Sequence, residues 1–141
     1  PAIKIMGYDK APSAVEKSLQ NVQNANLQAF VIISKNNFFH SEKTTQGPLH
    51  LLTNPPYGER LEGDINAIYQ SMGDTLKQSY PNTHAWMITA NMEAMKFVGL
   101  RPSRKIKIFN GKLESSLLYF PIYEGSKRTH KYIDSKKKEE E

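Results

Sequence analysis

The stretch RKIKIFNGKLESSLLYF, residues 104–120, decides the fold expected for this chain of 141 residues. It contains two strand-like runs joined at Asn110-Gly111, a dipeptide typical of the tight turn of a β-hairpin. The hairpin follows a long region in which strand-like and helix-like segments alternate, which predicts a mostly parallel sheet with crossover helices. We therefore expect an α/β fold whose parallel sheet ends in an antiparallel hairpin.

Short apolar runs before the hairpin are predicted to be the other strands, and they lie at residues 3–6, 29–34, 50–54 and 85–90. The run at 29–34 is continuous, which is typical of a strand covered on both faces, and the run at 50–54 is likewise expected to be buried. Residues 35–48 are polar and are expected to form a loop.

Three helices are expected between these strands. Pro12 suits a first helical turn, and Val15, Leu19 and Val22 recur on one face. Asp64 is predicted to cap the second helix, and Asn91 to cap a short third helix that ends at Gly99. The second helix has an apolar stripe formed by Ile65, Ile68, Tyr69, Met72 and Leu76, and it is expected to end at Pro81-Asn82.

Composition narrows the classes of function. The net charge of +5 favours a polyanionic partner such as nucleic acid, and the absence of cysteine excludes thiolate zinc sites and a cysteine nucleophile. The histidines at 40, 50, 84 and 130 show no metal-ligand spacing, so no metal is assigned; His50 and His84 are expected to be packing or surface residues. Neither a membrane span nor a signal peptide is visible, which predicts a cytoplasmic protein without membrane association.

A second stretch, LLTNPPYGERLEG at residues 51–63, contains the residues expected to form the binding site. Pro55 and Pro56 fix their own φ angles and hold Asn54 extended at the end of a strand. Because neither proline has an N–H, the segment presents acceptors, namely the Asn54 side-chain oxygen and the Pro55 carbonyl. The natural complement is a planar group that carries an NH₂, with Tyr57 stacked on it.

Such an amine is a poor nucleophile, and two acceptors that hold both hydrogens would aim its lone pair by positioning and electrostatics. An enzyme grips a base taken out of its stack in this way, and in-line transfer of an activated methyl from a sulfonium needs no metal and no covalent intermediate. The alternative is a proline-rich surface turn in which Asn54 makes a local bond. The position beyond the carboxyl end of a strand favours a binding site.

The motif Asn54-Pro55-Pro56-Tyr57 resembles motif IV of the S-adenosylmethionine-dependent methyltransferases that modify amino nitrogens. The longer NPPYGERL, together with AIY at 67–69 and NGKLESSLLY at 110–119, is similar to the RlmL-type family of RNA guanine-N2 methyltransferases, and the match runs from about residue 3 to about 125. This resemblance implies a Rossmann-like methyltransferase sheet. It makes residues 1–125 the carboxyl-terminal part of a catalytic domain, with 126–141 as a charged tail.

The resemblance also assigns roles to residues. Asn54, Pro55, Pro56 and Tyr57 would hold and stack the target base, with Asn54 also beside the cofactor. Asp9 would accept hydrogen bonds from the ribose hydroxyls of S-adenosylmethionine, unless it caps the helix ahead of Pro12. Asn36, or Asn37 if the alignment slips by one, would contact the cofactor adenine, where the family usually has an acidic residue. Arg60 would contact the substrate, although an exposed ion pair with Glu59 is equally open.

The chain departs from the family in what precedes residue 3. The family's first strand and Gly-rich turn are not found, and neither is its amino-terminal THUMP region. That strand normally lies between the strands that begin near residues 3 and 50, so unpaired edges are expected there. Either a partner chain fills the gap or the piece binds cofactor poorly, and the oligomeric state is left open, with a homodimer as one alternative.

The function implied is S-adenosylmethionine-dependent methyl transfer to an exocyclic amine of an RNA base, guanine N2 of ribosomal RNA in the first instance. Adenine N6 methylation of DNA or RNA and a catalytically silent nucleic-acid-binding fragment are the alternatives. A basic cluster at the hairpin either meets phosphates or keeps an edge strand soluble, and it consists of Arg101, Arg104, Lys105, Lys107 and Lys112.

Overall fold

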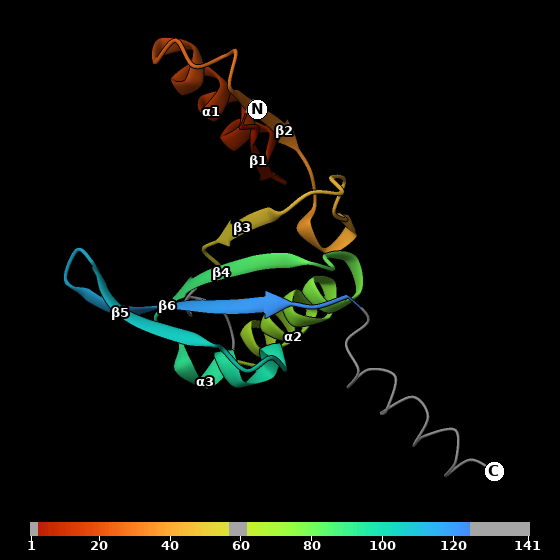
Figure 1. The fold of residues 1–141 in the computed structure, drawn as a ribbon. Coiled ribbons are helices and arrows are strands. Elements are labelled where there is room, and N and C mark those ends of the chain that lie inside the picture. Colours follow the sequence, from red (N-terminus) through yellow and green to blue (C-terminus); the bar gives the residue numbers. More distant parts are fainter. Residues whose placement is uncertain (1–2, 57–61, 125–141) are drawn as a thin grey trace. The chain divides into compact units, whose positions relative to one another are not determined.

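The computed structural model describes residues 3–56 and 62–124, which form two compact units. The first unit ends at Glu42, and the second begins at Lys43. Figure 1 shows the elements of each. Within the described ranges, no helix has the length and apolar character that a membrane span requires.

The first unit is a β-α-β arrangement. Strand β1 (Ile5–Asp9) pairs in parallel with β2 (Val31–Lys35), and helix α1 (Pro12–Asn24) connects them (Figure 1). Pro12 occupies the first helical turn as predicted. A short 3₁₀ helix, η1 (Phe38–His40), lies in the region expected to be a loop.

The second unit is a four-stranded sheet of order β3-β4-β6-β5. Strand β3 (Leu49–Thr53) runs parallel to β4 (Thr83–Thr89), whereas β6 (Leu113–Ile122) is antiparallel to both β4 and β5 (Arg104–Asn110). Its helices are α2 (Glu62–Ser79), α3 (Met92–Met95) and the 3₁₀ helix η2 (Lys96–Val98). The predicted α/β fold with parallel pairs and a terminal antiparallel hairpin is therefore confirmed.

The hairpin turn forms one residue later than the dipeptide suggested. Asn110 pairs with Leu113, so Gly111 and Lys112 are the two turn residues. Gly111 has φ of 65°, while Lys112 is not among the residues with positive φ. A positive φ at the first central position alone is typical of a type II′ turn, which requires glycine there.

The core of the second unit lies between α2 and one face of the sheet. Ile65, Tyr69, Met72 and Leu76 of α2 are buried, and the sheet contributes Ala85, Met87, Leu118, Phe120 and Ile122. Ile68, the remaining member of the predicted stripe, is half-buried. The helical spacing thus identified the buried face of α2 correctly.

Two strands are less covered than the sequence predicted. The interpretation of 29–34 as a strand covered on both faces is wrong, since Ile32 of β2 is 56% exposed. The run at 50–54 was expected to be buried, but β3 is an edge strand and Leu52 is 68% exposed. Among the described residues β1 and β3 each pair with one neighbour, so both present the unpaired edges that the sequence led us to expect.

The predicted cap of α2 is also wrong. The helix begins at Glu62, so Asp64 lies within its first turn rather than ahead of it. An acidic side chain in that turn still interacts favourably with the helix dipole. By contrast, the Asn91 side chain accepts a hydrogen bond from the Ala94 amide at 2.9 Å, and Gly99 ends the segment with φ of 72°, both as predicted.

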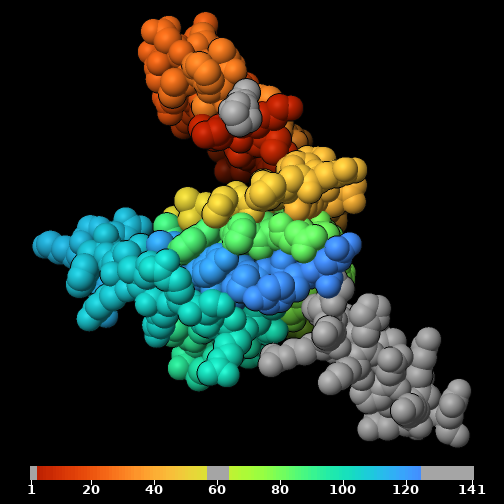
Figure 2. Space-filling model, in the orientation of Figure 1, coloured from red at the N-terminus to blue at the C-terminus, as the bar shows by residue number. Residues whose placement is uncertain are grey.

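A row of rings crosses the sheet face opposite the core. His50 stacks on His84, whose ring stacks on Tyr119, and Tyr119 stacks on Trp86 at a centroid distance of 4.5 Å. His84 Nδ1 and the Tyr119 hydroxyl are hydrogen-bonded at 2.5 Å. Side chains of β3, β4 and β6 are visible at the surface in Figure 2. Both histidines therefore take part in packing, in agreement with the sequence-based expectation.

Candidate functional site

The motif residues Asn54, Pro55 and Pro56 directly follow β3, at the carboxyl edge of the parallel pair β3–β4. Thr53 lies opposite Met87, so the motif continues alongside the end of β4 at Thr89. Asn54 is exposed and Pro55 is buried. This is the edge at which open α/β sheets bind their ligands.

A chain of hydrogen bonds holds the motif to the end of β4. The Tyr69 hydroxyl donates to the Pro56 carbonyl at 3.1 Å and lies 2.7 Å from Thr89 Oγ1, which accepts from the Asn91 amide at 3.0 Å. Because a tyrosine hydroxyl has one proton, and Pro56 receives it, Thr89 must donate to Tyr69. Hydrogen-bond donation therefore runs from the Asn91 amide, at the cap of α3, through the Thr89 and Tyr69 hydroxyls to the Pro56 carbonyl.

We expect Tyr69→Phe to lower the free energy of unfolding by about 1–3 kcal/mol, because it leaves the buried Thr89 hydroxyl without its acceptor and the Pro56 carbonyl without its donor. Tyr69 and Thr89 are both 0% exposed. The measurement is urea unfolding of the 141-residue chain, followed by the fluorescence of Trp86. The control is Tyr123→Phe, since Tyr123 is 72% exposed and should tolerate the change. Equal stability of both variants would contradict a role for the buried hydroxyl.

The structure distinguishes the two proline carbonyls of the motif. Pro56 accepts from Tyr69, whereas no described residue donates to the carbonyl of Pro55. The Pro55 oxygen thus stays a candidate acceptor for a ligand. Tyr57, Glu59 and Arg60 lie outside the described residues.

Asp9 ends β1 in the first unit, and its carboxylate is only partly used. Oδ1 accepts from the Ala11 amide at 2.9 Å, in a local turn before α1. The alternative that Asp9 caps this helix is wrong, because Ala11 is the N-cap and α1 has no side-chain cap. No described group donates to Oδ2, which leaves it as an acceptor for a ligand hydroxyl.

Asn36 is held next to Asp9, since its amide donates to the Asp9 carbonyl at 3.0 Å. The side chain of Asn37 instead accepts from the Phe39 amide at 3.0 Å and begins η1. Of the two residues that the sequence left open, Asn36 is therefore the better candidate acceptor. Asp9 and Asn36 lie together in the first unit, while Asn54–Pro56 belong to the second.

The described residues contain no cluster of three or more His, Asp or Glu side chains that could hold a metal ion. The candidate residues of the first unit offer carboxylate and amide oxygens, and the motif of the second unit offers amide and carbonyl oxygens. Such acceptors bind hydroxyl and amine donors.

The model of the RMKL-like methyltransferase domain family matches residues 1–118. The chain belongs to this family. It is 35% identical to the ribosomal RNA large subunit methyltransferase K/L of Cellvibrio japonicus (strain Ueda107) over 125 residues, which are 84% of this chain and 16% of that protein. The chain thus spans less than a fifth of the length of this relative.

Two solved structures are similar in fold. SMU.472, named as a methyltransferase and solved with SAH, has 25% identity and a TM-score of 0.75 over 85% of this chain and 32% of its own. A predicted N6-adenine-specific DNA methylase of Listeria monocytogenes str. 4b F2365 has 23% identity and a TM-score of 0.69 over 84% of this chain and 30% of its own. The expected Rossmann-like methyltransferase fold is confirmed.

In this RMKL-like methyltransferase domain, the residues that sequence reasoning missed are Tyr69 and Thr89. Tyr69 was assigned only to the apolar stripe of α2. A signal was present, because a tyrosine at a buried helical position usually needs a partner for its hydroxyl. Thr89 gave no such signal, since threonine is common in strands.

Proposed function

We propose that the protein transfers a methyl group from S-adenosylmethionine to an exocyclic amino nitrogen of an RNA base, and that guanine N2 of ribosomal RNA is the target. The observation that carries this proposal is the Asn54-Pro55-Pro56 segment at the carboxyl edge of β3, with the Pro55 carbonyl left as an acceptor. The membership of the RMKL-like methyltransferase domain family supports the reaction class.

In this proposal, Asn54 and the Pro55 carbonyl each accept one hydrogen of the amino group. Their task is to orient the nitrogen, because its lone pair is otherwise delocalised into the base. The buried Tyr69 hydroxyl keeps the loop in place by binding the next carbonyl, that of Pro56. Tyr57 is proposed to stack on the base, and Arg60 to contact the substrate.

The residues of the first unit fit the cofactor. Asp9 has an acceptor oxygen for a ribose hydroxyl, and the Asn36 side-chain carbonyl can accept from an adenine amine. S-adenosylmethionine supplies an electrophilic methyl group when it is bound. These two residues supply orientation through their acceptor oxygens.

The whole protein is proposed to contain more than this chain. The unpaired edges of β1 and β3 support further strand pairing in the intact protein, and the exposed apolar side chains of β1 and β2 support a further covering segment. We propose that the family's missing strand and Gly-rich turn belong to this additional part. We likewise propose that the intact protein contains a THUMP region and forms a homodimer. The name of the Cellvibrio japonicus relative supports ribosomal RNA as the substrate.

The experiment that tests the proposal maps the methylated atom. Total RNA from cells that lack the gene is compared by mass spectrometry with RNA from the parent strain. We expect the loss of a single N2-methylguanosine from the large ribosomal RNA, restored by the intact gene. Loss of N6-methyladenosine instead would select the second candidate, adenine N6 methylation, which the same motif can accommodate because adenine also carries a planar NH₂. An unchanged set of modified nucleosides would contradict both.

A further inference from the structure

An open cavity of about 520 Å³ lies in the second unit, beside the end of β4, the first half of β5 and the start of β6. Its lining includes Thr89, Lys105, Lys107, Glu114 and Ser116. Thr89 is also the hydroxyl that binds Tyr69, whose own hydroxyl binds the Pro56 carbonyl. Thr89 therefore connects the cavity to the motif through the Tyr69 hydroxyl. The volume of the cavity lies in the range of sites that hold small ligands.

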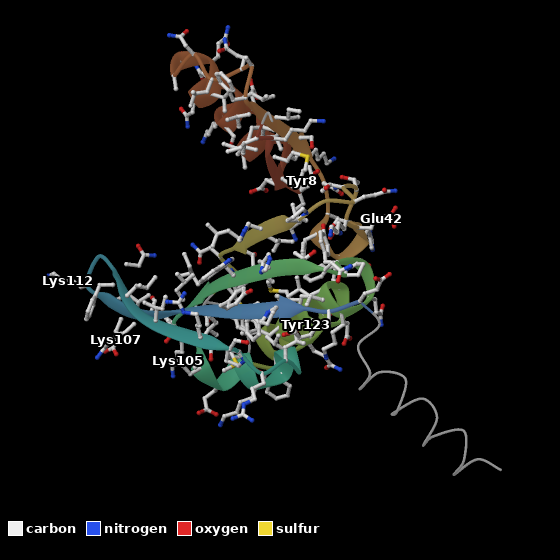
Figure 3. All side chains as sticks on the ribbon, viewed as in Figure 1. Tyr8, Glu42, Lys105, Lys107, Lys112 and Tyr123 are labelled. Atoms are coloured by element: carbon white, nitrogen blue, oxygen red, sulfur yellow. The ribbon has the colours of Figure 1, made fainter. Side chains whose placement is uncertain are left out.

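The strand register divides the basic cluster of the hairpin into separate groups. Lys107 pairs with Ser116, which pairs with Thr89, so these side chains share one face of the sheet. Lys105, two residues before Lys107, shares that face, while Arg104 lies on the opposite face against Tyr119. Figure 3 shows Lys105 and Lys107 along β5 and Lys112 at the turn. Only two members of the cluster therefore line the cavity.

The polar groups of this cavity suit an anion. A lysine ammonium has donors and no acceptor, and it is a common point charge for phosphate. Lys105 has no ion-pair partner among the described residues, and Lys107 pairs with Glu114 at 3.0 Å. This ion pair is exposed, with 64% and 61% of the two side chains accessible, so a stronger anion can compete for Lys107. The Ser116 hydroxyl adds a further donor.

We propose that this cavity binds the backbone phosphate of the nucleotide next to the methylated base, through Lys105, Lys107 and Ser116. This inference rests on the proposed function, because it assumes that RNA approaches the motif. It assigns Lys105 and Lys107 to the substrate site and leaves Arg104 outside that site. A phosphate contact fixes the position of a strand without reading its sequence.

The test measures binding of fluorescent single-stranded RNA to the intact protein by anisotropy across a range of salt concentrations. For the double variant K105Q/K107Q we expect Kd to rise about tenfold. The slope of log Kd against log salt should fall by about 0.7, because the cavity holds one phosphate and each phosphate contact on a single strand contributes about 0.7. The loss should be the same for two RNAs of unrelated sequence.

The matched control is K17Q/K96Q. It removes the same charge from two exposed lysines, of which Lys96 is likewise in an exposed ion pair, with Glu93 at 3.1 Å. We expect its salt slope to equal that of the wild type. If both double variants change the slope equally, the effect is that of net charge and the cavity proposal is overturned. A loss that depends on RNA sequence would overturn it as well.

A gain of binding provides a second arm. In E114Q the counter-charge of Lys107 is removed while the side-chain shape is kept, so we expect RNA binding to tighten by about two- to fivefold. Unchanged or weaker binding would contradict the proposal. Methyl transfer by the wild type is followed in parallel. Its absence would reject the proposed function, whereas normal transfer with no effect of the cavity variants would reject this inference alone.

Discussion

Asn54→Ala is expected to lower kcat for methyl transfer by about 10²–10³-fold, the effect typical of removing one preorganised hydrogen-bonding group from an active site. The variant loses the side-chain acceptor of the proposed pair, so the amine keeps a single partner, the Pro55 carbonyl. The free energy of unfolding should change by no more than about 0.5 kcal/mol, because Asn54 is exposed at the end of an edge strand. Transfer of labelled methyl to RNA by the intact protein provides the measurement.

Two further variants make this prediction specific. Asn54→Asp keeps an acceptor oxygen at the same place, so it should retain more activity than Asn54→Ala. The negative charge of the new side chain also changes which donor groups bind to it. Asn21→Ala on the exposed face of α1 is the neutral control. Full turnover in Asn54→Ala would remove the site assignment, and a large loss of stability would indicate a structural role for this side chain.

The parts of the fold that depend on local chemistry could be predicted from the sequence. The hairpin follows from a glycine that accepts positive φ, and the buried face of α2 follows from helical spacing. Burial of β2 and β3 could not be predicted, because an apolar run indicates a strand but not whether both faces of its sheet are covered. Leu52 pairs with Trp86 on the face opposite the core, and it is exposed there.

In the candidate site, too, the features that depend on neighbouring residues could be predicted, and those that depend on distant contacts could not. The position of Asn54 directly after β3 could be predicted from Pro55 and Pro56, because a proline restricts the backbone of the residue before it. The choice between Asn36 and Asn37 depended on which side chain binds a nearby amide, and that required the backbone path into η1. The partners of Tyr69 are distant in sequence, at 13 and 20 residues, so spacing could not reveal them.

Gly73 illustrates a tertiary constraint that the sequence hides. In the middle of a helix, glycine is usually a weakness, and its replacement by alanine stabilises the helix by about 1 kcal/mol. Here α2 passes so close to η2 that a Cβ atom on Gly73 would lie 1.8 Å from the carbonyl oxygen of Val98 and 2.6 Å from its carbonyl carbon. Both are backbone atoms, so no side-chain rotation relieves the contact.

We therefore expect Gly73→Ala to destabilise the second unit by about 3 kcal/mol, because the strain of forcing an extra carbon into a packed contact exceeds the gain in helix propensity. Urea unfolding of the 141-residue chain, followed by Trp86 in β4, should show a lower midpoint with an unchanged m value. Ser71→Ala, on the exposed side of α2, is the matched control and should stay within about 0.5 kcal/mol. If Gly73→Ala were as stable as the wild type, α2 and η2 could not approach each other at Val98 as described. The position of Asn91, and with it the hydrogen bonds that run from Asn91 to the motif, would then be contradicted as well.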